Sequence, residues 1–200
     1  EATTEATGLG NVVGNKGAVA VKLMLDDTSF CFVSSHLAAH EGAKFLQQRN
    51  DAVVEIMRNL EKNGRTGAPP ALHRFHHIIW MGDLNYRLDL ARGLPRAANW
   101  DHEVKWKHIN NIVQAARYDE LAVFDELRGE RELGNAFASF SEGPLHFPPT
   151  FKVVRGLPTS SYQILRLPSY CDRIMWHSLP RHARHITLVE YSSMEQYCTS

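Results

Sequence analysis

Residues 18–35 read AVAVKLMLDDTSFCFVSS, and this stretch decides the class of fold. From residue 18 to residue 25 branched apolar side chains alternate with other residues, which is the period of a β-strand; they are Val19, Val21, Leu23 and Leu25. Asp26-Asp27-Thr28 supplies a turn, and residues 30–35 form a second apolar run. The stretch therefore predicts a β-hairpin, and its antiparallel pair argues against a purely parallel sheet.

The sequence after the hairpin alternates between helical and strand patterns, and the sequence before it predicts a loop. Residues 41–62 repeat apolar side chains at steps of three and four, which predicts a helix that ends at Asn63-Gly64. Residues 1–16 are small, polar and rich in glycine, and we expect a loop there. Further patterns predict strands at 77–81, 173–177 and 186–191, helices at 103–117 and 119–128, and an extended loop over 139–154. This alternation indicates the α/β class, with a mixed sheet that helices cover.

Length and composition fit one ordinary globular domain. The chain has 200 residues, of which 44% are hydrophobic. Lys plus Arg equals Asp plus Glu at 22 each, so there is no overall basic field and we expect no nucleic-acid partner. No apolar run is long enough for a transmembrane segment. Three cysteines without metal-ligand spacing predict a reduced, cytoplasmic setting. The start at Glu1, without Met or a signal sequence, favours an internal piece of a longer protein.

Two segments place acidic residues at strand ends. Residues 80–87 read WMGDLNYR: an apolar strand ends at Asp83, Gly82 permits close backbone approach, and Asn85 shares a side with Asp83 if the segment is extended. Such a carboxylate and amide can activate and orient water, although Asp and Asn are also common in strand-end turns. Residues 168–176 read PSYCDRIMW. There Asp172 can orient a histidine and Arg173 can bind a phosphate, unless the two form a surface ion pair.

Three shorter segments offer groups that could bind an anion. GNKG at 14–17 is a tight turn with a basic side chain, but it lacks the spacing of a nucleotide-binding loop. His36 follows the second strand of the hairpin and can donate to a phosphate oxygen, whereas His40 is expected to be structural. FPPTFK at 147–152 is a proline-stiffened loop with one aromatic residue and one lysine. Taken alone, each is better explained as an ordinary turn, a structural histidine or a solvated lysine.

Together, and in this order, the five segments resemble the inositol polyphosphate 5-phosphatase family of the deoxyribonuclease I-like, endonuclease/exonuclease/phosphatase superfamily. WMGDLNYR and PSYCDRIMW resemble its two signatures, and GNKGAVAV, SSHLAAHEGAKFLQQRN and FPPTFK also match, over nearly all of residues 8–200. The resemblance implies a four-layer sandwich: two mixed β-sheets packed face to face, with helices outside. Residues 1–200 would be a partial catalytic domain, truncated at both ends. It further implies Mg²⁺-dependent hydrolysis of the 5-phosphate monoester of phosphoinositide lipids or soluble inositol polyphosphates.

The resemblance also implies roles for individual residues. Asp83 would accept a proton from the attacking water, Asn85 would position that water or the phosphate, and His36 would stabilise charge on the scissile phosphate. Asp172 would orient a second histidine. The implied substrate-binding residues are Asn15, Lys16, Arg87, Phe151, Lys152 and Arg173, with Lys152 and Arg173 on the 4-phosphate.

Two parts of the family's pattern are missing from this chain. The main metal-binding Glu is expected upstream of residue 1, so the metal ligands are unknown, and the histidine that Asp172 would orient is expected just beyond Ser200. We therefore expect the intact protein to be active and these 200 residues alone to be inactive. The alternatives are an inactive phosphoinositide-binding domain, and a nuclease or other diesterase, which the neutral net charge disfavours. Peripheral contact with cytoplasmic membrane faces stays open.

Overall fold

The computed structural model describes residues 2–6, 16–62, 70–157 and 161–194, and these residues build a six-stranded mixed sheet. Its strands are β1 (Ala2–Ala6), β2 (Gly17–Leu25), β3 (Thr28–His36), β4 (His77–Asp83), β5 (Ser141–Glu142) and β6 (Asp172–Ser178), in the order β1-β2-β3-β4-β6-β5. The pair β3–β4 is parallel and the other pairs are antiparallel. The predicted hairpin is confirmed. The loop expected over residues 1–16 is wrong at residues 2–6, which pair with β2 as an edge strand.

The helices are α1 (Ala43–Lys62), α2 (Ala71–Arg74), α3 (His102–Gln114), α4 (Tyr118–Leu121) and α5 (Glu126–Glu132), with 3-10 turns at Leu90–Arg92, Pro95–Asn99, Ala122–Phe124 and Ala183–His185. The helices expected at 41–62 and 103–117 are confirmed, and the Asn63-Gly64 end lies outside the described residues. The helix expected at 119–128 is found in pieces: α4 and a 3-10 turn cover Tyr118–Phe124, and α5 follows. It is broken at Asp125, which is extended and caps α5 by accepting from the Arg128 N–H. The strand expected at 186–191 is wrong: that segment is irregular.

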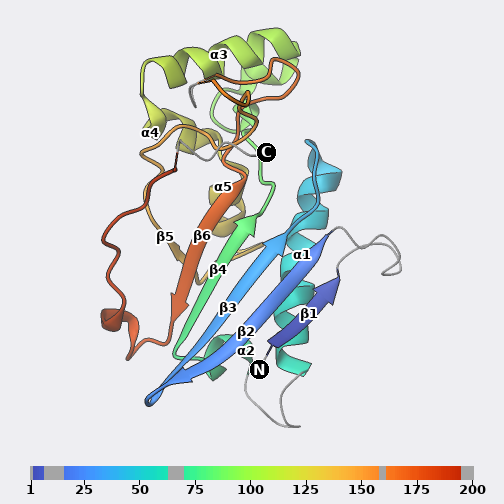
Figure 1. The fold of residues 1–200 in the computed structure, drawn as a ribbon. Coiled ribbons are helices and arrows are strands. Elements are labelled where there is room, and N and C mark those ends of the chain that lie inside the picture. The colour runs from blue at the N-terminus through green and yellow to red at the C-terminus, as the bar shows by residue number, and fades with distance from the viewer. Residues whose placement is uncertain (1, 7–15, 63–69, 158–160, 195–200) are drawn as a thin grey trace.

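One face of the sheet packs against α1, which lies behind the strands in Figure 1. The other face carries exposed apolar side chains on β2, including Val19, Val21 and Leu23. This is strand alternation, because Ala18 and Ala20, at the alternate positions, are buried on the opposite face. The α/β class with a mixed sheet and flanking helices is confirmed. Among the described residues the second sheet of the expected sandwich is not formed, and the exposed apolar face is the one such a sheet would cover.

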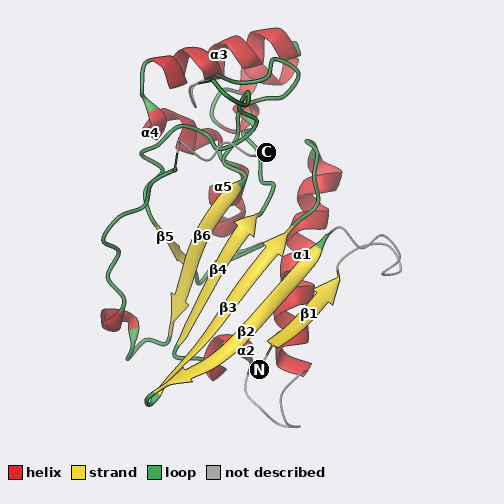
Figure 2. Ribbon diagram, in the orientation of Figure 1, coloured by secondary structure: helices red, strands yellow, loops and turns green. Residues whose placement is uncertain are grey.

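A second apolar core lies at the end of the sheet where β4 finishes. It joins α3 and α4 to the loops around them, and Figure 2 shows these helices and loops gathered above that end. Its central side chains are Leu88, Ile109, Leu121, Phe147 and Tyr170, all at most 6% exposed. This core holds the loops that surround the strand ends. No helix in the described ranges has the length and apolar character needed to cross a membrane.

Candidate active site

Strand direction brings three predicted site residues to one edge of the sheet. Because β3 and β4 are parallel, their carboxyl ends lie together, and His36 pairs in register with Asp83. β6 runs the opposite way and begins at this edge, so Asp172 pairs with Asp83 from the other side. Figure 1 shows the ends of β3 and β4 and the start of β6 next to one another. Residues far apart in sequence therefore meet through the sheet alone.

The Asp83 carboxylate lies beside basic groups. Its Oδ2 is 3.2 Å from His36 Nε2, and the Lys16 ammonium lies 2.5 Å from the same Nε2. The His36 side chain is 48% exposed, so it can reach a ligand from solvent. The side chain of Asp83 is 33% exposed, which leaves part of its carboxylate open to the same space.

Burial raises the pKa of Asp83 and the neighbouring Asp172 carboxylate adds to this, while His36, Lys16 and Arg87 oppose the shift. Burial also lowers the pKa of Lys16, although Asp83 partly restores it. A carboxylate with a raised pKa holds a proton more readily than an ordinary aspartate. This environment suits a group that accepts a proton from water.

Two residues at the end of β4 and just beyond it, Gly82 and Asn85, have positive φ angles. The sequence did not indicate the one at Asn85. Gly82 has φ +130°, and a Cβ there would lie 2.1 Å from the Ser35 carbonyl oxygen, so the predicted close backbone approach is confirmed. Asn85 has φ +57°, so the expectation of an extended segment from Asp83 to Asn85 is wrong. Instead the Asn85 N–H donates to Asp83 Oδ1 at 3.1 Å, and its Nδ2 donates to the Leu37 carbonyl at 3.1 Å. Local hydrogen bonds of this kind favour a turn.

A pocket of about 410 Å³ opens at this edge of the sheet. The predicted residues that line it are His36, Asp83, Asn85, Arg87, Phe151 and Lys152. Three further basic residues line the pocket, namely His40, His102 and Arg166, which the sequence did not single out as ligand-binding. Arg166 and His102 lie in no recognisable motif, so only the fold could reveal them.

The loop that carries Phe151 and Lys152 reaches the pocket through a short β-bridge between Phe151 and Ser169. The Arg87 guanidinium lies 4.5 Å from the centroid of the Phe151 ring, a cation–π contact. It also donates to both oxygens of Asn85, from Nε to the backbone carbonyl and from Nη2 to Oδ1. These contacts fix the Arg87 guanidinium in place. Lys152, which lines the same pocket, has a flexible side chain and can adjust its ammonium to a ligand.

Arg173 does not reach the pocket, and the expectation that it binds a phosphate does not fit its surroundings. It is 2% exposed, donates from Nη1 to Asp125 Oδ1 at 2.9 Å, and donates from Nε to Glu142 Oε1 at 2.6 Å. These carboxylates outweigh burial and raise the pKa of Arg173. Its neighbour Asp172 is exposed on the opposite side of β6, as strand alternation requires. Asn15 lies outside the described residues.

Beneath the pocket lies a buried polar network. Arg49 of α1 donates to Glu126 Oε2 at 2.6 Å, and the same oxygen accepts the Arg87 N–H at 2.8 Å. Nearby, Asn50 donates to Glu130 and accepts from the Tyr86 hydroxyl. The network joins α1, α5 and the WMGDLNYR segment. Arg49 and Glu126 are far apart in sequence, as are Asn50 and Glu130, so no local pattern reveals these pairs and sequence reasoning could not find them.

The chain was compared with known families and proteins. The family model described as Endonuclease/Exonuclease/phosphatase family 2 matches residues 1–200. A similar curated protein is phosphatidylinositol 3,4,5-trisphosphate 5-phosphatase 2 of Sus scrofa, 36% identical over 205 residues that cover 97% of this chain and 15% of that protein. Phosphatidylinositol 3,4,5-trisphosphate 5-phosphatase 1 of Homo sapiens is 34% identical over 204 residues, which cover 97% of this chain and 16% of that protein. The chain thus spans less than a fifth of either relative.

Solved structures share the fold. The inositol polyphosphate 5-phosphatase domain of spsynaptojanin, crystallised with inositol (1,4)-bisphosphate and a calcium ion, superposes with a TM-score of 0.69 at 29% identity, over 89% of this chain and 46% of that one. A Cimex nitrophorin in its ferrous NO complex gives a TM-score of 0.61 at 18% identity, over 89% of this chain and 52% of that one. The second likeness shows a shared fold alone.

Proposed function

The chain belongs to the Endonuclease/Exonuclease/phosphatase family 2, and on this premise we propose that its pocket binds a phosphorylated inositol and removes the 5-phosphate by Mg²⁺-dependent hydrolysis. One observation carries the proposal. The strand ends gather a histidine, a carboxylate of raised pKa and an amide beside a wall of cations. The names of the similar curated proteins and the inositol bisphosphate bound to the similar solved domain support the same substrate class.

Two described carboxylates at this edge of the sheet fit a magnesium ion. Asp83, which lines the pocket, and Asp172, its register partner on β6, offer the hard oxygens that Mg²⁺ prefers. Mg²⁺ is commonly bound by one or two carboxylates together with waters and substrate phosphates. The repulsion that helps raise the pKa of Asp83 is one that a divalent cation would relieve. When bound, the ion would neutralise charge that develops on the phosphate.

The chain's own residues supply positioning and proton transfer. Asp83 Oδ2 accepts a proton from the attacking water, and His36, beside it, donates to the scissile phosphate. Asn85 Oδ1 accepts from Arg87, and one Nδ2 hydrogen is bound to Leu37, so the second Nδ2 hydrogen is available for the water or a phosphate oxygen. Phosphoryl transfer needs such fixed donors more than covalent chemistry.

We assign the neighbouring 4-phosphate to Lys152 alone, because Arg173 is committed to two buried carboxylates. Lys152→Ala should raise the KM for an inositol phosphate with phosphates at positions 4 and 5 by about 10–100-fold, since a hydrogen bond to a charged group contributes about 1.5–3 kcal/mol. The KM for a substrate with only a 5-phosphate should change little. Lys107→Ala, at an exposed lysine of α3, is the matched control. Equal KM changes for both substrates would contradict the assignment.

The pocket rim suggests how the protein meets a lipid substrate. Ile164 and Leu165 are 65% and 79% exposed, so these two apolar side chains do not pack inward and are accessible to a lipid surface. Leu165 also lines the pocket. We propose a cytoplasmic protein that touches membrane faces peripherally through this loop, with no nucleic-acid partner. Binding of phosphoinositide vesicles by a folded protein without phosphate release would favour the inactive binding domain instead.

A further inference from the structure

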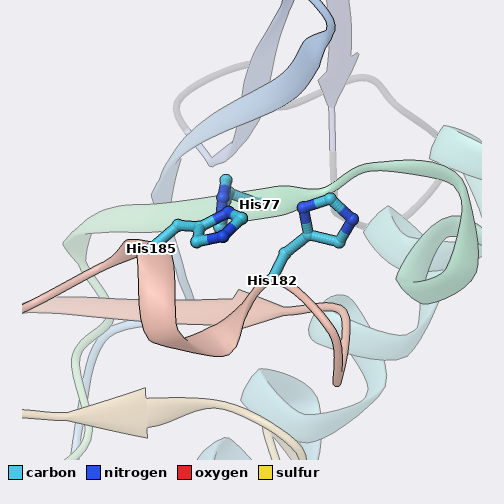
Figure 3. A group of neighbouring side chains, drawn as sticks. All are labelled: His77, His182 and His185. Carbon is cyan, nitrogen blue, oxygen red and sulfur yellow. The ribbon is translucent and has the colours of Figure 1, made fainter.

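Three histidines lie together at the opposite end of the sheet from the pocket. His77 begins β4, and His182 and His185 lie in the turn that follows β6. Figure 3 shows the three rings beside the start of β4. One potential ligand nitrogen from each lies within 4.8 Å of the others. β4 extends from His77 to Asp83, so the cluster and the pocket are about 20 Å apart at roughly 3.3 Å per residue.

Each histidine is held by local structure. His77 is 1% exposed, and its Nδ1 lies 2.9 Å from the hydroxyl of Ser178, its register partner on β6. This contact occupies Nδ1 and leaves Nε2 as the ligand atom, the arrangement in which an outer partner orients a metal-binding imidazole. The turn is fixed by backbone hydrogen bonds from His182 to Leu179 and from His185 to His182. His182 and His185 are three residues apart, and residues at this spacing in a 3-10 turn lie on the same side of it. Both rings therefore project from one side of the turn.

The cluster contains an unsatisfied group. His182 Nδ1 is buried and has no hydrogen-bond partner among the described residues. Buried polar atoms normally have a hydrogen-bond partner, and a place for a bound ion is one of the established reasons for an exception. His76 packs against His182 with 4.2 Å between the ring centroids. Its Nδ1 accepts from the Ser29 N–H, so in the neutral ring Nε2 carries the proton and offers no lone pair to a metal. Burial and the neighbouring imidazoles lower the pKa of His77 and of His182, which favours the neutral form that binds metals.

We propose that His77, His182 and His185 form a site for a divalent transition metal, with Zn²⁺ as the ion that fits best. Three imidazoles suit Zn²⁺ and leave a fourth position for water or another ligand. Nitrogens that bind one tetrahedral Zn²⁺ lie about 3.3 Å apart, given Zn–N bonds of about 2.0–2.1 Å. The three ligand nitrogens, which lie within 4.8 Å of one another, must therefore approach each other by up to roughly 1.5 Å for Zn²⁺ to bind. The turn that carries His185 is exposed and can supply that movement. Bound metal would tie the turn after β6 to the start of β4.

The test is Zn²⁺ titration of the tag-free chain by calorimetry, with Co²⁺ absorption as a second readout of tetrahedral nitrogen coordination. We expect one Zn²⁺ per chain at the three histidines, and no comparable binding of Mg²⁺ by those histidines. His185→Asn should weaken binding by more than the roughly 10–100-fold typical of losing an outer-shell partner. Because His185 is exposed, this variant should fold as the parent does, which circular dichroism would check. His146→Asn, an exposed histidine paired with Asp119, is the matched control and should bind normally.

Proteolysis gives an independent reading of the same site. Arg181 and Arg184 are exposed on either side of His182, so trypsin can cut there. Zn²⁺ should slow these cuts in the parent chain and in His146→Asn, and leave them unchanged in His185→Asn. The proposal is overturned if the parent chain binds no Zn²⁺, or if His185→Asn binds Zn²⁺ as tightly as His146→Asn. Neither result bears on phosphate hydrolysis at the distant pocket.

Discussion

At the scale of single residues, the chemistry depends on how Asp83 is surrounded. The WMGDLNYR segment predicted that a carboxylate stands at a strand end, and the structure adds its neighbours: His36 at 3.2 Å and Asp172 across the β4–β6 ladder. The sequence could place Asp83 because apolar runs and a glycine mark strand ends. It could not show that Arg173 is buried in ion pairs, since its partners come from segments distant in sequence.

In protein free of divalent cations, we predict that Asp83 titrates above the ordinary range of an aspartate, because burial and Asp172 both disfavour its charge. Asp172→Asn removes the like charge and should lower the Asp83 pKa. The Asp83 carboxyl signal in a ¹³C NMR pH titration measures both values. A pKa for Asp83 that is the same in the parent and in Asp172→Asn would show that the two carboxylates do not interact.

The raised pKa of Asp83 also makes the folding stability of the protein depend on pH. A folded-state pKa above the unfolded value means that the folded protein binds the proton more tightly. The contribution of Asp83 to folding stability is therefore fully present below its unfolded-state pKa, and it is lost as the pH rises through its folded-state pKa. Asp83→Asn, which keeps the side chain neutral at every pH, should be stabilised relative to the parent on the alkaline side of that window. Urea unfolding at several pH values measures this difference.

At the scale of elements, the junction of β3 and β4 depends on a glycine. Gly82→Ala places a Cβ 2.1 Å from the Ser35 carbonyl oxygen and also demands φ +130° from an L-residue. We expect it to lose clearly more stability than Gly134→Ala, where φ is +78° but no atom lies within 4 Å of the added Cβ. The left-handed backbone alone costs about 1–2 kcal/mol. Urea unfolding of both variants measures the difference, and equal losses would show that the strand contact relaxes without cost.

The attachment of α1 beneath the pocket depends on a buried ion pair. Arg49 is 0% exposed and lies 2.6 Å from Glu126, which also accepts the Arg87 N–H. Arg49→Met should cost about 3–5 kcal/mol, because it leaves the Glu126 carboxylate buried without its partner. Arg58→Met, at an exposed arginine of the same helix, should cost little. A loss below about 1 kcal/mol for Arg49→Met in chemical unfolding would mean that Glu126 is protonated or hydrated.

At the scale of the whole molecule, periodicity predicted the hairpin, α1, α3, β4 and β6, because each buries one regular apolar face. It failed where tertiary contacts decide the local structure. Residues 2–6 become a strand only by pairing with β2, and the apolar stripe at 119–128 is split at Asp125, whose carboxylate caps α5 and binds Arg173. The pocket itself follows from topology, since parallel β3 and β4 end at the same edge.

The central claim is that this edge of the sheet hydrolyses a phosphate ester with Asp83 as the proton acceptor. Its most direct test is phosphate release from a soluble phosphatidylinositol 4,5-bisphosphate analogue, with and without Mg²⁺, by the longest polypeptide that carries this sequence. We predict Mg²⁺-dependent release that Asp83→Asn lowers by about 10²–10⁴-fold, the usual contribution of a general base. Asp51→Asn, at an exposed aspartate of α1, should not lower it. Release by a folded Asp83→Asn protein at the parent's rate, or no release by the folded parent protein, would contradict the account.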